Sequence, residues 1–407
     1  MSGPRALAEE PRALAALVAW LGPWAPARAP RGVTRATWLL REGAPRGRRA
    51  RQSGAWRSAG GGRLEPTRLE AYVYEPEAAA RGPARREPEQ PVIGTFVVAP
   101  GLHFDGPADP RFDRFCRVLA RAGFRVVAPF LPSYLELLVT PEAPEDLEVC
   151  ALATAQRWLG PGERLTLFSI SFGSWPALEV AARQPELVDA VITFGGYADF
   201  HATVQFCADG VVHLPGGERA LRPFDPLNPP ALFVNLLPWL DAPAEAHEPL
   251  AEAWRELAYR TWGRMELKAP GRLAPFVESV AEGLPEEQRA LFRVGCGASP
   301  GTATLVAEAL ARAGAAFDFA SPREALRRLS CPVVVCHGRD DDVIPWTEAE
   351  ALHAALAGRP SRLFVTGLYD HTGSALPSPR AAVSEAATLL GLARVLASGG
   401  NVRALVR

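Results

Sequence analysis

The sequence predicts an α/β protein built on a mostly parallel, doubly wound sheet. Short apolar runs typical of buried strands alternate with segments of helical spacing over residues 69–200, and the alternation resumes over residues 322–407. Strands that alternate with helices pair in parallel, and the helices then cover both faces of the sheet. With 407 residues, of which 48% are hydrophobic, the chain is long enough for such a sheet and for an inserted or second domain.

The first alternating block carries most of the predicted core. Its strands are expected at residues 71–74, 92–98, 124–130, 165–170 and 188–194, and its helices at 110–122, 145–159 and 173–183. The first helix should begin at Asp109-Pro110, because aspartate caps free N–H groups and proline fits a first helical turn. Gly123 then ends that helix.

The second block repeats the pattern. It contains predicted strands at 332–336 and 362–365, a helix at 347–357, and a last helix opened by Ser378-Pro379. Between the blocks, residues 201–321 combine helical stretches with the Pro-rich apolar run 223–240. A loop of this length without structure is implausible in a compact protein, so we expect a helical insertion.

Residues 1–68 are expected to form an N-terminal helix followed by an arginine-rich extension. Glu9 and Glu10 precede the apolar stretch 13–21, which disfavours a secretory signal peptide and favours a helix docked on the body of the protein. Residues 28–68 hold eleven arginines and two glutamates. Contact with nucleic acid or with a membrane surface is an alternative for this block, but no aromatic stacking pattern or lysine cluster accompanies it, so a solvated extension with a strand at Thr37–Leu40 is favoured.

Composition excludes several classes of partner. The formal net charge of −1 gives no overall attraction to nucleic acid, and no apolar run reaches the ~20 residues of a membrane span. The six cysteines form no C-x-x-C pair, which predicts buried free thiols and a cytoplasmic location rather than a disulfide framework. No H-E-x-x-H spacing occurs, so no metal site is expected.

Ser171 is the candidate nucleophile. It lies at the centre of Ser169-Ile170-Ser171-Phe172-Gly173, directly after the predicted strand 165–170. This segment resembles the G-x-S-x-G nucleophile elbow, in which a sharp strand-to-helix turn exposes a serine hydroxyl above the sheet. Ser169 replaces the first glycine of that motif.

A literal G-x-S-x-G also occurs, at residues 297–301, and we reject it as the active site. Pro300 follows the serine and has no N–H, whereas the elbow uses the N–H at that position to bind an oxyanion. No strand is predicted before it. Ser299-Pro300 is instead expected to begin the helix that follows.

Asp341 is the candidate acid. Residues 337–345, His-Gly-Arg-Asp-Asp-Asp-Val-Ile-Pro, follow a predicted buried strand and resemble the H-G-x-x-D-x-x-[V/I]-P segment of α/β hydrolases. A buried carboxylate there would orient a catalytic histidine. A solvated acidic loop explains Asp340 and Asp342, and Asp199, which follows the strand 188–194, is an alternative acid.

His371 is the candidate general base. It lies in a short loop after the last predicted strand, 30 residues beyond Asp341, and completes the order Ser, Asp, His. In sheets of this kind ligands bind beyond the carboxyl ends of the strands, where all three residues are expected. His353 falls inside a predicted helix and is expected to be structural.

Together these segments resemble the α/β-hydrolase superfamily over residues 69–200 and 322–407. The resemblance implies a serine hydrolase that acts on an ester or related acyl bond and needs no cofactor. It also implies an oxyanion hole from the backbone N–H groups of Leu102 and Phe172, since residues 100–106 resemble the family's H-G-x-x-G loop. Acyltransferase or thioesterase activity, and a catalytically silent binding protein, stay open as alternatives.

The insertion, residues 201–321, is predicted to form a lid that favours an apolar acyl or alcohol group of a small substrate. Its run 231–240 is too apolar to lie free in water, so Phe233 and Trp239 are candidate pocket residues, together with His103 of the oxyanion loop. The alternative is that this run builds a small core of the insertion itself.

Overall fold

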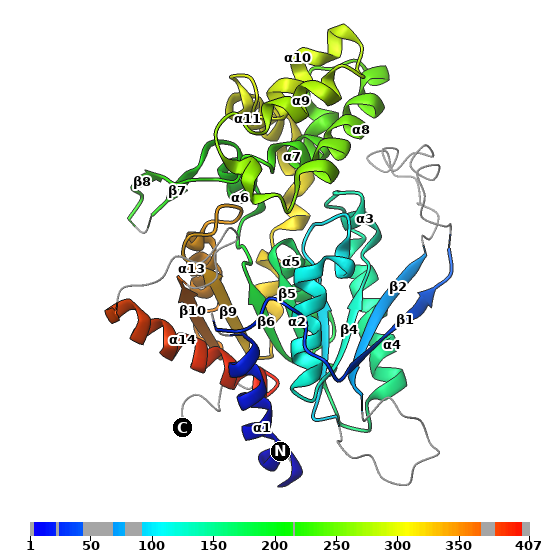
Figure 1. Cartoon of the computed structure of the whole chain (residues 1–407), viewed down its shortest axis with the longest axis vertical. Coiled ribbons are helices and arrows are strands. Elements are labelled where there is room, and N and C mark those ends of the chain that lie inside the picture. Colours follow the sequence, from blue (N-terminus) through cyan, green and yellow to red (C-terminus); the bar gives the residue numbers. More distant parts are fainter. Residues whose placement is uncertain are drawn as a thin grey trace.

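A computed structural model of the chain describes residues 4–21, 24–43, 68–77, 92–214, 216–367 and 379–400. Its centre is an eight-stranded sheet of order β1-β2-β4-β3-β5-β6-β9-β10 (Figure 1). The strands are β1 (Val33–Arg41), β2 (Leu69–Pro76), β3 (Thr95–Ala99), β4 (Arg125–Pro129), β5 (Leu165–Ile170), β6 (Val188–Phe194), β9 (Val333–Gly338) and β10 (Ser361–Thr366). Strand β2 runs antiparallel to β1 and to β4, and all pairs from β4 to β10 are parallel. This is the α/β-hydrolase architecture that the sequence predicts.

Helices cover both faces of the sheet. One face packs against α1 (Pro4–Leu21), α2 (Pro110–Arg121) and α14 (Pro379–Ala397), and the other against α4 (Ala143–Trp158), α5 (Ser174–Arg183), α12 (Arg323–Arg328) and α13 (Trp346–Ala355). Alternate residues of each central strand point to opposite faces, so Val97 of β3 joins one core while Phe96 and Val98 join the other. The continuous burial of β3 and β9 follows from this double cover.

The insertion connects β6 to β9 and is mostly helical, as predicted. It comprises α6 (Phe200–Asp209), β7 (Val211–His213), β8 (Arg219–Leu221), α7 (Pro229–Leu236), η5 (Leu237–Trp239), α8 (Ala244–Thr261), η6 (Met265–Lys268), α9 (Ala274–Ala281), α10 (Glu286–Gly295), α11 (Thr302–Ala313) and η7 (Gly314–Ala320). Figure 1 shows its helices gathered at one end of the molecule, with the β7–β8 hairpin projecting from their side. Since β6 leads directly into α6, this is the end at which the parallel strands terminate.

The N-terminal helix docks on the body of the protein, as its pattern predicts. Ala13 and Leu17 of α1 are fully buried, and α1 lies beside α14 in Figure 1 and packs against it. The strand expected at Thr37–Leu40 is longer, because β1 pairs with β2 from Val33 to Arg41, with a register shift between Leu39 and Arg41. Two arginines of β1 form ion pairs with carboxylates of the core: Arg35 with Asp113 and Arg41 with Asp146. Residues 44–67 lie outside the described ranges.

All six cysteines are free and buried, as the sequence analysis predicts for these thiols. Burial in apolar surroundings raises the pKa of the Cys150 thiol to about 12. Among the described helices, none combines the length and the apolar character that crossing a membrane requires.

Candidate active site

Ser171 occupies a strained turn between β5 and α5. The one-turn helix η4 (Ser171–Gly173) joins the two elements, and Ser171 has a φ of +53°, in the left-handed region. A side chain other than glycine in this region costs roughly 1–3 kcal/mol, and such strain is concentrated at functional sites. The turn arises because a buried strand must pass at once into a buried helix, whose second and third residues are Trp175 and Pro176.

The loop after β3 lies directly against this turn. A Cβ atom added to Gly173 would come within 2.4 Å of the carbonyl oxygen of Pro100, and one added to Gly101 within 3.2 Å of the Ser171 Cβ. Only glycine permits both approaches without displacing backbone. The two segments predicted to supply oxyanion donors therefore lie side by side.

A cavity of about 360 Å³ opens over Ser171. The core lines it with the loop that includes Leu102 and His103, with Ile170, Ser171 and Phe172, and with Val343 of the loop after β9. The insertion supplies much of the rest, mostly as apolar side chains: Phe200, Val204, Leu227, Leu232, Leu236 and Phe317. A concave, mainly apolar site with a few polar groups is typical of small-molecule binding.

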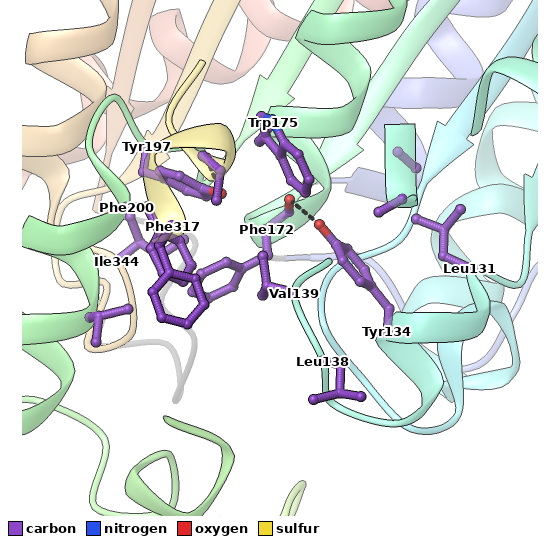
Figure 2. Packing of buried hydrophobic residues seen from close by; sticks show 14 of the residues in the cluster. Leu131, Tyr134, Leu138, Val139, Phe172, Trp175, Tyr197, Phe200, Phe317 and Ile344 are labelled. Carbon is purple, nitrogen blue, oxygen red and sulfur yellow. Dashed lines mark hydrogen bonds between the residues drawn. The ribbon is translucent and has the colours of Figure 1, made fainter. Parts of the chain in front are cut away.

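The candidate oxyanion donors, Leu102 and Phe172, both line this cavity. The N–H of Leu102 donates to no acceptor among the described residues. On the opposite side of the elbow, the hydroxyl of Tyr134 donates to the carbonyl oxygen of Phe172 at 2.9 Å, as Figure 2 shows. Tyr134 lies in α3 (Pro132–Leu135) and is fully buried. The sequence analysis missed this residue, because nothing in its local pattern marks it.

Asp341 lies in the loop after β9 with its side chain buried. Its Oδ1 accepts the backbone N–H groups of Val343 and Ile344, each at 2.9 Å. His337, at the end of β9, is 0% exposed and donates from Nε2 to the carbonyl oxygen of Ile344 at 2.7 Å. The same Nε2 lies 3.4 Å from Asp341 Oδ2. His337 therefore holds the loop that carries Asp341, a role that the sequence analysis missed.

The neighbouring aspartates differ from Asp341. Asp340 is exposed, as expected for a solvated loop. Asp342 is not solvated: its carboxylate lies 2.8 Å from the Nζ of Lys268. The expectation of a solvated position is therefore wrong for Asp342, since a cation of the insertion covers it.

The alternative acid, Asp199, has a structural role. Its side chain caps α6 by accepting the N–H of Ala202, and it forms an ion pair with Arg323. The backbone N–H groups of Ala198 and Asp199 donate to the buried carboxylate of Glu348, at 3.0 and 2.8 Å. Burial raises the pKa of Glu348 to about 7. These contacts fix the point at which the insertion leaves the core.

His371 lies outside the described residues, and the structure describes only the start of its loop. Strand β10 pairs in parallel with β9, so that Thr366 lies opposite Gly338, three residues before Asp341. Glu385 of α14 accepts the Thr366 hydroxyl at 2.6 Å and the Gly367 N–H at 2.8 Å. The last described residues before His371 thus lie beside the strand that leads to Asp341.

His103 is among the residues that line the cavity. Its Nδ1 accepts the N–H of Asp105 at 3.1 Å, which leaves the proton on Nε2, 3.5 Å from Asp109 Oδ2. Burial lowers the pKa of His103, so the ring is neutral at neutral pH. It stacks on Phe104, with ring centroids 4.4 Å apart.

Phe233 and Trp239 do not lie where the sequence analysis expected them. Neither is among the described residues that line the cavity. Phe233 is fully buried against Trp254, with centroids 5.4 Å apart, and Trp239 packs on Phe317 at 4.9 Å. Both build the core of the insertion, because α7 turns its Leu232 and Leu236 face, rather than Phe233, toward the cavity.

The second G-x-S-x-G segment lies away from the cavity, between α10 and α11. The helix does not begin at Ser299-Pro300 as expected: α11 starts at Thr302, with Gly301 as its N-cap in a left-handed conformation. Among the described residues, no group of three or more His, Cys, Asp or Glu side chains could hold a metal ion.

Comparisons with known proteins give structural likeness only. No family model matches the sequence, and no curated protein matches it. Brefeldin A esterase, a bacterial homologue of human hormone sensitive lipase, is 16% identical, with a TM-score of 0.45 over 98% of this chain and 87% of that chain. An acylaminoacyl peptidase of Pyrococcus horikoshii is 12% identical, with a TM-score of 0.41 over 87% of this chain. The chain spans only 40% of the length of that peptidase. The fold assignment rests on the strand order given above.

Proposed function

We propose that the protein is a serine hydrolase that cleaves a carboxylic ester or related acyl bond, with Ser171 as its nucleophile. The observation that carries this proposal is the left-handed backbone of Ser171 at an apolar cavity, in contact with the loop of Pro100 and Gly101. A strained serine at a strand-to-helix turn is the geometry that exposes a hydroxyl for attack. The cavity supplies room for the acyl or alcohol part of a substrate.

In the proposed mechanism, His371 removes the proton of the Ser171 hydroxyl as its Oγ attacks the substrate carbonyl carbon. The N–H groups of Leu102 and Phe172 stabilise the negative charge that develops on the carbonyl oxygen. His371 then gives the proton to the leaving alcohol, and an acyl-enzyme forms on Ser171. Water, deprotonated by His371, attacks this ester and releases the acid and the free serine.

Asp341 is proposed to orient His371 and to stabilise its imidazolium form. Two observations support this role. The backbone N–H groups of Val343 and Ile344 hold the buried carboxylate in one orientation, and β10, the strand that precedes His371 in the sequence, pairs with β9. Asp341→Asn should therefore lower kcat by orders of magnitude while the fold is kept.

The insertion is proposed to act as a lid that selects apolar acyl or alcohol groups. Its helix α7 offers a matched test, because Leu236 lines the cavity while Phe233, three residues earlier, does not. Leu236→Ala should enlarge the cavity and raise kcat/KM for long-chain aryl esters relative to short-chain ones. Phe233→Ala should lower stability by roughly 3–5 kcal/mol and leave that ratio unchanged. An equal chain-length profile for wild type and Leu236→Ala would contradict the lid.

The experiment that tests the function itself is covalent labelling with a fluorophosphonate probe, followed by a panel of aryl esters and thioesters. The proposal predicts stoichiometric labelling of the wild type and hydrolysis of at least one ester. A chain that folds but neither reacts with the probe nor hydrolyses any member of the panel would instead be a silent binding protein on this fold.

A further inference from the structure

Lys268 is the only lysine in a chain of 44 lysine and arginine residues, and it lies between two carboxylates. It ends η6 in the insertion, and its Nζ lies 2.7 Å from Asp225 Oδ2 and 2.8 Å from Asp342 Oδ2. All three side chains are largely buried, with exposed fractions of 16%, 12% and 13%. An ammonium group carries three donors and can therefore donate to two carboxylates at once.

These contacts join the insertion to the loop of the proposed acid. Asp225 and Lys268 belong to the insertion, whereas Asp342 directly follows Asp341. The N–H of Asp225 also donates to the carbonyl oxygen of Asp342 at 2.8 Å. A further contact comes from α6, where the Cys207 thiol donates to the carbonyl oxygen of Val343 at 3.0 Å.

The loop is thus held from two sides. The insertion fixes the carbonyl groups of Asp342 and Val343, while Asp341 itself binds the N–H groups of Val343 and Ile344. Movement of Asp342 would therefore reorient the backbone N–H groups of Val343 and Ile344, to which the Asp341 carboxylate is hydrogen-bonded.

We propose that Lys268 is a positioning residue, through which the insertion orients the loop of Asp341. This inference rests on the proposed function, since it assigns Asp341 the role of acid. It goes further, because it makes the insertion part of the catalytic arrangement and not only a cover over the cavity. Loss of the ammonium group would remove the cation that lies between Asp225 and Asp342, and the stronger repulsion between the two carboxylates would shift the loop.

The test compares Lys268→Met with Arg264→Met. Arg264 precedes η6 and pairs with Glu266 at 2.9 Å, but this pair is exposed and does not touch the loop of Asp341. One measurement needs no activity: hydrogen exchange at the backbone amides of Val343 and Ile344. Lys268→Met should speed their exchange about 10-fold, and Arg264→Met should leave it unchanged.

The second measurement is kcat per active site, titrated with the fluorophosphonate probe. Lys268→Met should lower kcat about 10- to 100-fold. Because Lys268 also lines the cavity, any change in KM is measured separately and does not count toward the positioning role. The acidic limb of the kcat/KM profile should move to lower pH, because a misplaced Asp341 stabilises the imidazolium of His371 less. Lys268→Arg, which keeps the charge, should recover part of the lost kcat and move the acidic limb part of the way back. If Lys268→Met does not fold, Asp342→Asn should give smaller shifts in the same directions.

The outcomes separate the two claims. Unchanged amide exchange in the Lys268 variants would overturn the contact as a constraint on the loop, whatever the protein does. Faster exchange with unchanged kcat and pH profile would overturn the positioning role. A wild type that neither reacts with the probe nor hydrolyses an acyl substrate would overturn the proposed function and the positioning role together, and the exchange data would still measure the constraint itself.

Discussion

Two segments of this chain share the spacing of a nucleophile motif, but their positive φ angles fall on different residues of the motif. In residues 297–301, the match to G-x-S-x-G is literal, and the glycines Gly297 and Gly301 carry the positive φ angles, +70° and +111°. In residues 169–173, the match lacks its first glycine, and Ser171 itself is left-handed. The literal motif is an unstrained turn between two helices, whereas the imperfect one ends a buried strand at a cavity.

The difference shows that the elements around a motif decide its chemistry. Strand β5 and helix α5 force the turn at Ser171, and the loop after β3 leaves room only for glycine at position 173. Around Gly301, the nearest atom to an added Cβ is Val294 Cγ1 at 3.8 Å, which is ordinary contact. Glycine is therefore required at position 173 by close backbone contact, whereas position 301 has space for a side chain.

The largest expected effect is the loss of activity in Ser171→Ala. Removing the nucleophile of such a triad costs 10³-fold or more, about 10⁶-fold in well-studied cases, so ester hydrolysis should fall to background. Ser299→Ala, the matched change, should keep wild-type kcat/KM. Full activity in Ser171→Ala would show that Ser171 is not the nucleophile and would contradict the functional difference between the two segments.

The second effect separates steric crowding from backbone strain. Gly173→Ala places a methyl group within 2.4 Å of the Pro100 carbonyl oxygen, so the oxyanion loop must move, and kcat/KM should fall about 100-fold. Gly301→Ala meets only strain from its φ of +111°, and should cost about 1–3 kcal/mol in stability without loss of kcat/KM. Steady-state kinetics and thermal unfolding of both variants would test this pair. Equal kinetic losses would show that the two turns are not as different as the structure indicates.

A smaller effect should follow from Tyr134→Phe. This change removes the hydroxyl that donates to the Phe172 carbonyl at 2.9 Å and leaves a buried acceptor unsatisfied. Stability should fall by about 1–3 kcal/mol, and kcat by about 10-fold, since the Phe172 peptide borders the oxyanion hole. Denaturant unfolding and kcat per labelled site would measure the two losses. A loss of stability with unchanged kcat would show that the Tyr134 hydroxyl stabilises the fold but does not contribute to catalysis.

The smallest effect measures the strain itself. Because Ser171 is left-handed, Ser171→Gly should be more stable than Ser171→Ala by about 1 kcal/mol. At Ser299, which has no positive φ, the order should reverse, with glycine less stable than alanine by about 0.5–1 kcal/mol. Unfolding free energies of the four variants would decide the point. If glycine and alanine rank in the same order of stability at both positions, the backbone of Ser171 is not strained.

The sequence was sufficient for the core of the fold, because burial on both faces makes β5 and β6 mostly apolar, and their predicted bounds, 165–170 and 188–194, agree with the observed ones. It was insufficient inside the insertion. In the run 231–240 every residue is compatible with either a pocket or a core, so apolar character could not show that Leu236 faces the cavity and Phe233 the insertion.

Polar contacts between distant segments were also beyond the sequence. Tyr134 and Phe172 are 38 residues apart, and Lys268 and Asp342 are 74 apart. No local pattern relates such pairs, since only the packed structure brings them together. One signal was available: Lys268 is the only lysine in an arginine-rich chain, which singles out the position but does not name its partner.

The most direct test of the central claim is the position of a fluorophosphonate adduct in the folded wild type. Trypsin should release Ser171 in the peptide of residues 165–183 and Ser299 in the peptide of residues 294–312, so mass spectrometry separates the two segments. We predict a single adduct, localised by fragmentation to Ser171, and an unmodified second peptide. An adduct on Ser299, or on a serine of neither peptide, would contradict the assignment of Ser171 as the nucleophile.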